Sequence, residues 1–213
     1  MGQTVAEVAR EEPNIEIVAR CDEGDSIATP MKDCDVAIDF SVPDMAEEIC
    51  RAAMQERRAV VIGTTGHSVR QKDAIKTAAD SVPIVFASNF SVGVNALFWL
   101  AGKAAEILGP EFNASIVETH HQMKKDAPSG TAKTLGEILK RSKKMSADIP
   151  IQSIRQGEVV GEHTVSFSGP GEELELAHHA KSRATFAGGA LTAAKWVVGK
   201  PPGLYSMQDV LGL

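Results

Sequence analysis

Short apolar runs alternate with longer amphipathic segments over the first 90 residues, which is the pattern of strands followed by helices. The apolar runs cover residues 15–19, 36–40, 59–62 and 83–87. Alternation at these lengths predicts right-handed βαβ units and a parallel sheet. Ligands of such sheets bind beyond the carboxyl ends of the strands, so the loops after these runs are candidate sites.

The starts of the helices support this order. Residues 3–12 are predicted to form the first helix. Asp44 with Glu47, and Ser68 with Gln71, have the spacing of capping boxes at the starts of two further helices. The second and third strands are therefore each followed by a helix.

The pattern changes near residue 90. A long helix is predicted over residues 92–108, a strand over 114–118 and another helix from near Gly130. Residues 151–179 contain several strands separated by glycines, and residues 187–198 form a last helix. The predicted fold class is therefore α/β plus α+β, with the second pattern following the first.

Composition and charge narrow the possible partners. The chain has 213 residues, of which 43% are hydrophobic, which is enough for a proper core. A net charge of −6 gives no reason to expect nucleic acid or a membrane surface as a partner. Cys21, Cys34 and Cys50 lack C-x-x-C spacing, which favours reduced core thiols in a cytoplasmic protein. Pro83, Asn89 and Asn95 interrupt the uncharged stretch 81–102, so no membrane span is predicted.

Residues 118–131 form the segment with the most candidate chemistry. Two imidazoles and two ammonium groups lie within six residues, directly after a predicted strand. Such a cluster repels itself unless it binds an anion, and the N-terminus of the following helix offers free N–H groups to a carboxylate. A histidine here can act as a general acid, because its ordinary pKa lies near neutrality. The alternative is a solvated loop in which Ser129 is only an N-cap.

The complete string E-T-H-H-Q-M-K-K-D-A-P-S-G-T-A closely resembles the signature of the dihydrodipicolinate reductase family, also called 4-hydroxy-tetrahydrodipicolinate reductase. Further similar segments are V-I-G-T-T-G at 61–66, S-N-F-S-V-G-V at 88–94, V-G-E-H-T at 160–164 and H-H-A-K-S-R-A-T-F-A-G-G-A at 178–190. The resemblance is specific and extends over the whole chain. It implies reduction of 4-hydroxy-tetrahydrodipicolinate to tetrahydrodipicolinate by NAD(P)H in lysine and diaminopimelate biosynthesis.

The resemblance also implies roles for single residues. His120 would be the proton donor, and Lys124 a catalytic partner that also contacts the substrate. The implied residues for the substrate carboxylates are His121, Ser129, Gly130 and Thr131, with Arg183 as a supporting cation. The cofactor would supply the hydride, so the protein needs only to orient, protonate and stabilise the substrate.

The implied cofactor site lies in the first half. Its residues, matched to the loops against which the family's nicotinamide packs, are Gly63, Thr64, Thr65, Ser88, Asn89 and Phe90. Asp22 matches the acidic residue that binds the adenosine ribose hydroxyls. Its neighbour is Glu23 rather than the arginine often found where the phosphorylated cofactor is used, which favours NADH over NADPH. On its residues alone, Asp22 could instead belong to an ordinary turn.

The N-terminus departs from the family pattern. A dinucleotide-binding half should begin with an apolar strand and G-x-x-G-x-x-G, of which residues 1–5 match only the end. We expect an N-terminally truncated Rossmann-like domain, residues 1–89 and 184–213, with its first strand missing. An inserted mixed-sheet domain for substrate binding and oligomerisation is expected over residues 90–183. Because most of the glycine loop is missing, we expect weak binding of the cofactor. The alternative is a relative of the family that folds and oligomerises but turns over its substrate poorly.

A different class of function is a metal-dependent hydrolase. Its ligands would be His120, His121, His178 and His179. Adjacent histidines on a strand point in different directions, and no H-x-x-x-H spacing accompanies them, so no metal site is expected. The family's self-association implies a homotetramer.

Overall fold

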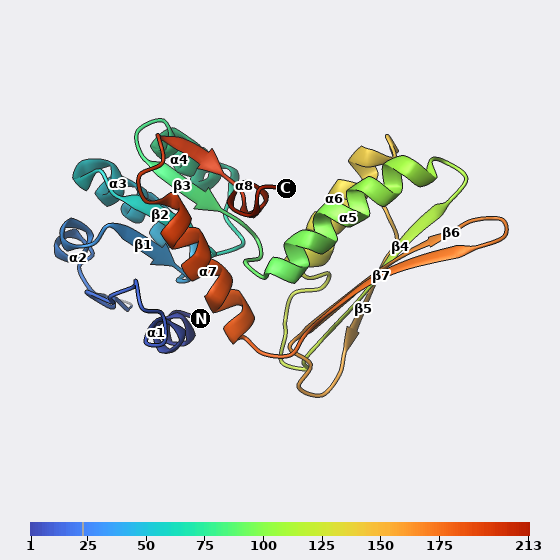
Figure 1. Cartoon of the computed structure of the whole chain (residues 1–213), viewed down its shortest axis with the longest axis horizontal. Helices are drawn as coiled ribbons and strands as arrows, with labels where there is room; N and C mark the ends of the chain where they lie inside the picture. Colours follow the sequence, from blue (N-terminus) through green and yellow to red (C-terminus); the bar gives the residue numbers. More distant parts are fainter. Residues whose placement is uncertain (23) are drawn as a thin grey trace. The chain divides into compact units, whose positions relative to one another are not determined.

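The chain folds into two compact units, which Figure 1 shows in the computed structural model of residues 1–22 and 24–213. The first unit consists of Met1–Ser91 and Phe186–Leu213, and the second of Val92–Thr185. Glu23, on which the expected cofactor preference depends, lies outside the described residues. Each unit is described by itself below.

The first unit is built on a parallel sheet with the strand order β1-β2-β3-β8. The strands are β1 (Val36–Asp39), β2 (Ala59–Ile62), β3 (Pro83–Phe86) and β8 (Gly203–Tyr205). All four residues of β2 are buried. A strand that is covered on both faces has no polar face, which is why these strands appear in the sequence as continuous apolar runs.

Helices cover both faces of this sheet. One face packs against α2 (Ala28–Asp33), α3 (Ala46–Glu56) and α4 (Val69–Ala79). The other packs against α7 (Ala184–Val197) and α8 (Met207–Leu211), while α1 (Gly2–Ala9) packs on α7. This arrangement confirms the predicted Rossmann-like sheet.

Residues 15–19 do not form the strand predicted for them. Ile17 and Val18 are 37% and 51% exposed, and no strand pairs with the outer edge of β1 among residues 1–22 and 24–213. A strand needs a neighbour to receive its backbone hydrogen bonds, and an alternating pattern alone does not supply one. The prediction was wrong for that reason. Cys21, expected to be a core thiol, is likewise exposed.

Only one of the two predicted capping boxes forms. Ser68 and Gln71 cap α4 reciprocally, as predicted. Asp44 instead lies in the 3₁₀ turn η1 (Pro43–Met45) before α3, and its Oδ1 accepts a hydrogen bond of 3.1 Å from Gln71 Nε2. Glu47 forms an ion pair with Arg70 at 2.9 Å. Both acidic side chains therefore connect α3 to α4 rather than cap α3.

The second unit is a mixed sheet covered on one face by two helices. The strand order is β5-β4-β6-β7, in which β4 and β5 are parallel and the other neighbours antiparallel. The strands are β4 (Asn113–His120), β5 (Ile151–Arg155), β6 (Gly161–Ser168) and β7 (Glu173–Ala180). The helices are α5 (Val92–Leu108) and α6 (Gly130–Ser142). This is the mixed sheet predicted for the second half.

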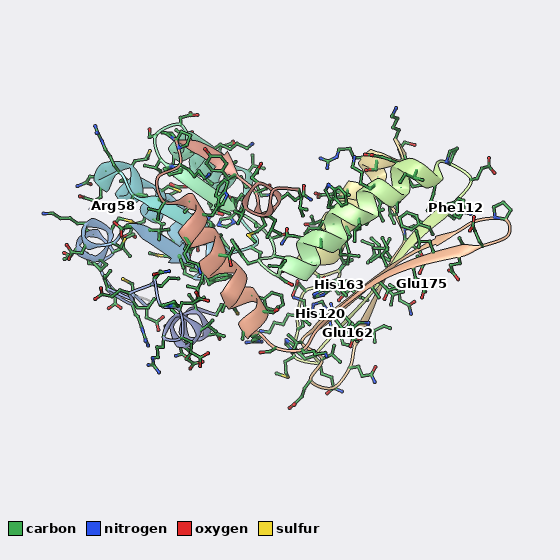
Figure 2. All side chains as sticks on the ribbon, in the orientation of Figure 1. Arg58, Phe112, His120, Glu162, His163 and Glu175 are labelled. Carbon is green, nitrogen blue, oxygen red and sulfur yellow. The ribbon has the colours of Figure 1, made fainter. Side chains whose placement is uncertain are left out.

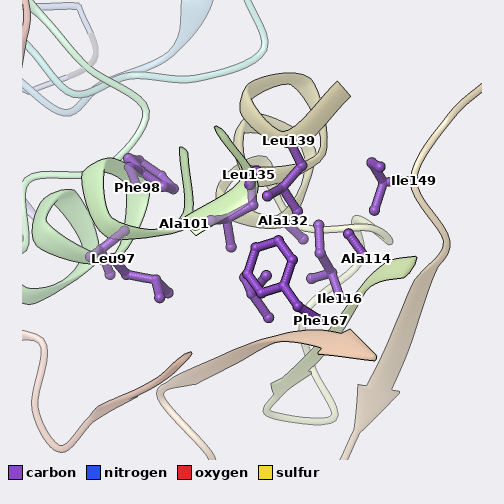
Figure 3. Close-up of a cluster of buried hydrophobic side chains, with 13 residues drawn as sticks. Leu97, Phe98, Ala101, Ala114, Ile116, Ala132, Leu135, Leu139, Ile149 and Phe167 are labelled. Atoms are coloured by element: carbon purple, nitrogen blue, oxygen red, sulfur yellow. The ribbon is translucent and has the colours of Figure 1, made fainter. Parts of the chain in front are cut away.

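The core of this unit lies between the sheet and the two helices (Figure 3). Every second residue of β4 and β6 is buried, so one face of the sheet meets the helices. Ile116 and Phe167 from the strands pack with Leu97 of α5 and with Leu135 and Leu139 of α6. Among the described residues, no helix is both long and apolar enough to cross a membrane.

Candidate functional site

The buried face of β4 changes character along the strand. Ala114 and Ile116 belong to the apolar core, whereas the next two buried positions are Glu118 and His120. Burial of a carboxylate or an imidazole is costly unless hydrogen bonds and opposite charges compensate for the lost water. The carboxyl end of β4 must therefore provide such partners.

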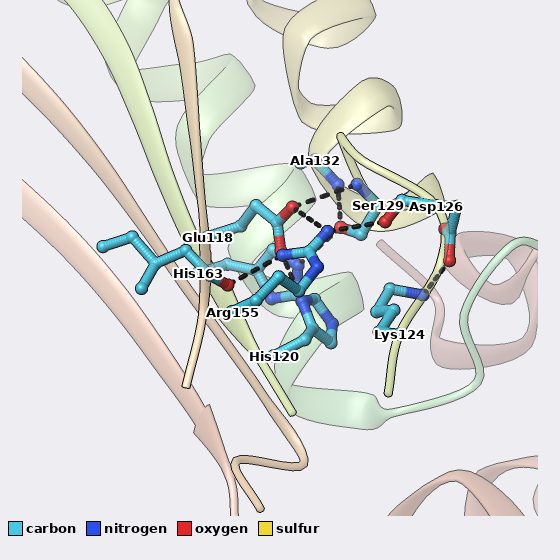
Figure 4. Close-up of polar contacts among 9 residues, drawn as sticks. Glu118, His120, Lys124, Asp126, Ser129, Ala132, Arg155 and His163 are labelled. Atoms are coloured by element: carbon cyan, nitrogen blue, oxygen red, sulfur yellow. Dashed lines mark hydrogen bonds and ion pairs between the residues drawn. The ribbon is translucent and has the colours of Figure 1, made fainter. Parts of the chain in front are cut away.

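The Glu118 carboxylate, which is 0% exposed, is the centre of this polar network (Figure 4). Its Oε1 accepts hydrogen bonds from Arg155 Nη2 at 2.9 Å and from the Ser129 N–H at 3.2 Å. Its Oε2 accepts from Arg155 Nη1 at 3.1 Å and is in close contact with His120 Nδ1. The carboxylate and guanidinium are thus paired in a bidentate fashion, and their charges cancel inside the protein.

Strand register explains why these side chains meet. His120 lies opposite Arg155 on the parallel strand β5, and Glu118 lies opposite His163 on the antiparallel strand β6. The His120 and His163 rings meet edge to face at 5.2 Å between centroids, and Figure 2 shows them together at this end of the sheet. Gly161 precedes His163 on the same face, and a side chain there would contact His120 Nε2 at 3.1 Å.

The N-terminus of α6 forms the other side of the network. Ser129 is its N-cap: its Oγ accepts the Ala132 N–H at 3.2 Å and lies 3.2 Å from His163 Nε2. Gly130 and Thr131 open the helix, and Thr131 is buried. A helix of this length presents free N–H groups and a positive dipole end at its start, which suits a carboxylate.

The network shifts the pKa values of its members. Burial acts to raise the pKa of Glu118, but hydrogen bonds from Arg155 and the neighbouring donors prevail and lower it to about 2. Burial lowers the pKa of His120, although the Glu118 carboxylate counteracts this. Burial and the nearby His120 lower the pKa of His163 to about 3. Glu118 is therefore ionised and both histidines are neutral at neutral pH.

Other predicted substrate residues lie in the loop between β4 and α6 or beyond β7. Lys124 Nζ pairs with Asp126 Oδ1 at 2.8 Å, and the Lys124 N–H donates to the His121 carbonyl at 3.1 Å. The His121 side chain is half-buried. Arg183 is exposed in the turn before α7, and within the described part of the chain it is not joined to the Glu118 network. The assignment of Arg183 to the substrate stays a prediction.

The predicted cofactor residues lie at the carboxyl edge of the parallel sheet. Gly63 and Thr64 directly follow β2, and Thr64 Oγ1 is buried with no hydrogen-bond partner in the described structure. A Cβ on Gly63 would lie 2.2 Å from the Phe40 ring, so this position needs glycine. Thr65, next in the loop, is exposed. This loop therefore combines a glycine packed against the Phe40 ring, a buried hydroxyl and an exposed threonine.

The neighbouring strand β3 leads into the other predicted cofactor segment. Ser88 is exposed, and Asn89 Oδ1 accepts the Ser91 N–H at 2.8 Å. Phe90 is buried with its ring edge against Phe40, at 5.7 Å between centroids. Because β2 and β3 are adjacent and parallel, both loops lie at the same edge. Asp22 is exposed, and its N–H donates to Asp25 Oδ2 at 2.8 Å.

Four polar residues of these regions are not among those predicted from the sequence. Arg155 and His163 complete the Glu118 network, while Asp39 and His67 are buried at the carboxyl edge of the first sheet. Asp39 Oδ2 and His67 Nε2 have no hydrogen-bond partner among the described residues. The available signal was a charged residue at the end of an apolar strand, as in V-A-I-D and I-Q-S-I-R.

The geometry does not favour the metal alternative. In the described chain, the acidic and histidine groups that could hold an ion together are Glu118, His120 and His163, with donor atoms within 4.8 Å. Both Glu118 oxygens already accept from Arg155, so a divalent cation there would face a guanidinium charge. The other histidines of the expected alternative, His121, His178 and His179, belong to no such group among these residues.

Comparison with known families matches both units. The family model described as "Dihydrodipicolinate reductase, N-terminus" matches residues 1–90, and the one described as "Dihydrodipicolinate reductase, C-terminus" matches residues 93–211. A 4-hydroxy-tetrahydrodipicolinate reductase of Akkermansia muciniphila is 46% identical over all of this chain and 94% of its own length. One of Hahella chejuensis is 45% identical over 89% of this chain and 78% of its own.

Solved structures show the same fold. A dipicolinate-bound dihydrodipicolinate reductase from Paenisporosarcina sp. TG-14 superposes with a TM-score of 0.78 at 23% identity, covering 98% of this chain and 94% of that one. A diaminopimelate (DAP) dehydrogenase of C. glutamicum gives a TM-score of 0.57 at 11% identity, covering 97% and 89%. The matched units, the identity with curated relatives and the shared fold agree, and the chain belongs to the dihydrodipicolinate reductase family.

Proposed function

We propose that this chain reduces 4-hydroxy-tetrahydrodipicolinate with His120 as the proton donor. Membership of the family makes it an NAD(P)H-dependent oxidoreductase of lysine and diaminopimelate biosynthesis. The assignment of His120 is supported by one observation: a neutral imidazole, held by a buried carboxylate, lies beside the N-terminus of a helix. A proton donor and a carboxylate-binding element are thus adjacent in one unit.

The substrate unit is the second one. We assign the substrate carboxylates to the turn Ser129–Gly130–Thr131 at the start of α6, with His121 and Arg183 as further contacts. Lys124, half-buried beside Asp126, would hold the substrate close to the acid. A dianion bound here favours the imidazolium form of His120, because opposite charge stabilises the protonated ring. The acid is therefore expected to take up its proton as the substrate binds.

The cofactor unit is the first one. NADH or NADPH would supply the hydride, and the residues present fit a dinucleotide at the carboxyl edge of the sheet. Gly63 has no room for a side chain, and the buried Thr64 hydroxyl can donate to the cofactor. Thr65 and the segment Ser88–Phe90 would border the nicotinamide. Asp22 would bind the ribose hydroxyls, and its carboxylate favours NADH because it would repel a ribose phosphate.

We further propose that the chain acts as a homotetramer in the cytoplasm. Support for self-association comes from a groove on the second unit lined by exposed apolar side chains of α5 and β7. The exposed large side chains that line it are Trp99, Leu100, Ile107 and Leu174. Exposed apolar patches of this kind mark interaction sites. The three free cysteines suit a reducing compartment. Light scattering of the purified chain tests the oligomer size.

A steady-state assay tests the reaction and the acid separately. Loss of NADH absorbance that depends on the substrate reports the reaction. Replacing the acid, His120→Gln, is expected to lower kcat by about 10² to 10⁴, the range for loss of a general acid. His179→Gln is the matched control, since that exposed ring pairs with Glu162 at 3.2 Å on β6.

The outcomes separate the alternatives. A wild-type chain that folds but does not oxidise NADH would favour the poorly active relative. Equal kcat in His120→Gln and His179→Gln would show that His120 is not the proton donor. The ratio of kcat/KM for NADH and NADPH measures the proposed preference, and activity that survives metal chelation argues against a hydrolase-like metal site.

A further inference from the structure

Glu118 contacts two parts of the proposed machinery at once. Its Oε2 faces Nδ1 of His120, while its Oε1 accepts the N–H of Ser129 at the start of α6. We propose that Glu118 is a positioning residue, paired with Arg155, that fixes His120 in the Nδ1–H tautomer and makes Nε2 the proton-carrying atom. This proposal deepens the assignment of His120 as the acid and rests on it.

The tautomer follows from hydrogen-bonding rules. An ionised carboxylate can only accept hydrogen bonds, so the ring nitrogen in contact with it must carry the hydrogen. Arg155 keeps Glu118 ionised through two hydrogen bonds, at 2.9 and 3.1 Å. Nδ1 of His120 is therefore the donor to Glu118, and the neutral ring has its lone pair at Nε2.

Nε2 lies where a substrate proton can be exchanged. It adjoins Gly161, which has no side chain to cover it; a Cβ there would be 3.1 Å away. The proton from solvent would first bind to Nε2 and form the imidazolium. In the reaction, the N–H bond at Nε2 breaks, its electron pair stays on nitrogen, and the proton joins the ring carbon next to the one that receives the hydride.

The charges around the His120 ring explain why the Glu118 carboxylate affects protonation of this ring. The groups that face His120 are Glu118 on its own strand, Arg155 on β5, Lys124 in the following loop and the neutral His163 on β6. Lys124 and Arg155 disfavour a charged imidazole, whereas Glu118 favours it. Loss of the Glu118 charge is therefore expected to make the imidazolium harder to form.

Nitrogen NMR tests the tautomer without any variant. In the ¹⁵N-histidine-labelled protein at neutral pH, the His120 signals, assigned by their loss in His120→Gln, should show a protonated Nδ1 and an unprotonated Nε2. The same spectrum of Glu118→Gln should lose the pure Nδ1–H form and gain hydrogen on Nε2, because an amide whose oxygen accepts the Ser129 N–H turns its nitrogen, a donor, toward Nδ1. A wild-type ring with hydrogen on Nε2, or an equal mixture, overturns the proposal.

Kinetics test what the tautomer does. Glu118→Gln keeps an acceptor for the Ser129 N–H, so KM for the substrate should change by less than about threefold. Its kcat should fall by about 10²-fold, between the effects of losing an outer-shell partner and a triad carboxylate. Its kcat, which depends on imidazolium, should also decline at lower pH than in the wild type, by about one pH unit. Asp148→Asn is the matched control, because it removes a carboxylate from the exposed ion pair with Lys140 and should leave kcat unchanged.

The results distinguish this proposal from the assignment of the acid. If Glu118→Gln keeps kcat within twofold while His120→Gln is impaired, His120 is the acid and Glu118 does not position it. If His120→Gln is unimpaired, the assignment of the acid fails whatever the tautomer is. If Glu118→Gln does not fold, the tautomer of the wild-type ring decides alone: hydrogen on Nδ1 supports the proposal, and hydrogen on Nε2 overturns it.

Discussion

The buried imidazole of His163 makes the second unit sensitive to mild acid. Its pKa in the folded protein is about 3, against an ordinary value of 6.5. Below about pH 6.5 the unfolded chain binds a proton on this histidine that the folded chain does not, so folding stability declines as pH falls. The decline continues until the pH reaches the folded pKa. At about pH 5 the difference spans about 1.5 pH units, which at about 1.4 kcal/mol per unit gives about 2 kcal/mol.

Urea unfolding at about pH 7.5 and at about pH 5 measures this effect. In a Trp196→Phe background the remaining tryptophan, Trp99, lies in α5 and reports on the second unit. The variant His163→Gln keeps a side chain that can hydrogen-bond with Ser129 Oγ but cannot titrate. We expect the parent to lose about 2 kcal/mol more between the two pH values than this variant.

The comparison isolates one histidine among several. His120 also has a lowered pKa, but it is present in parent and variant alike. Glu118 loses its charge only well below the tested range, since its folded pKa is about 2. His179→Gln, on the exposed side of β7, is the control and should follow the parent. If His163→Gln and the parent lose the same stability to within about 0.5 kcal/mol, the burial of a neutral His163 is refuted.

Three further predictions concern two glycines and the N-cap of α6. Gly161→Ala would place a methyl group 3.1 Å from Nε2 of His120, so the ring must shift, and kcat in the steady-state assay should fall by about tenfold with little change in KM. Gly189→Ala would place a Cβ 1.7 Å from a backbone carbonyl oxygen and should cost about 3 kcal/mol in urea unfolding, whereas Gly188→Ala, with open space around it, should not destabilise. Ser129→Ala removes the N-cap of α6 and should lower the free energy of unfolding by about 1 kcal/mol and raise KM for the substrate. Ser68→Ala removes the N-cap of α4 and should lower stability by a similar amount without changing KM.

Much of the fold could be predicted because local patterns and tertiary structure agree. The apolar run 59–62 is β2 to the residue, and the helix predicted over 92–108 is α5. The run 15–19 has an equally good strand pattern but forms no strand. The run 59–62 lies between two neighbouring strands and is buried on both faces, so it becomes a strand. In the part of the chain that the structure describes, the run 15–19 has no neighbouring strand to pair with, and its sequence pattern does not reveal that. Periodicity therefore predicts an element well only where the partner is also present.

The candidate site shows the same limit more sharply. The segment with His120 and Ser129 could be found because its residues are close in sequence and dense in charge. Arg155 and His163 could not, since they reach the site through strand register, 37 residues from Glu118 in the first case and 34 residues from Ser129 in the second. Register depends on how whole strands pair, so no local motif encodes it.

Burial then determines the chemistry that register brings together. A histidine in a solvated loop would titrate near its ordinary pKa and could use either ring nitrogen. At the end of β4, His120 is buried against a carboxylate that Arg155 keeps ionised, so the ring has one donor direction and a lowered pKa. A dianionic substrate can reverse that shift, because it adds the negative charge that the neutral network lacks. Under the proposed assignment, His120 is neutral without substrate and charged with it, which couples proton uptake to binding of the molecule that will receive the proton.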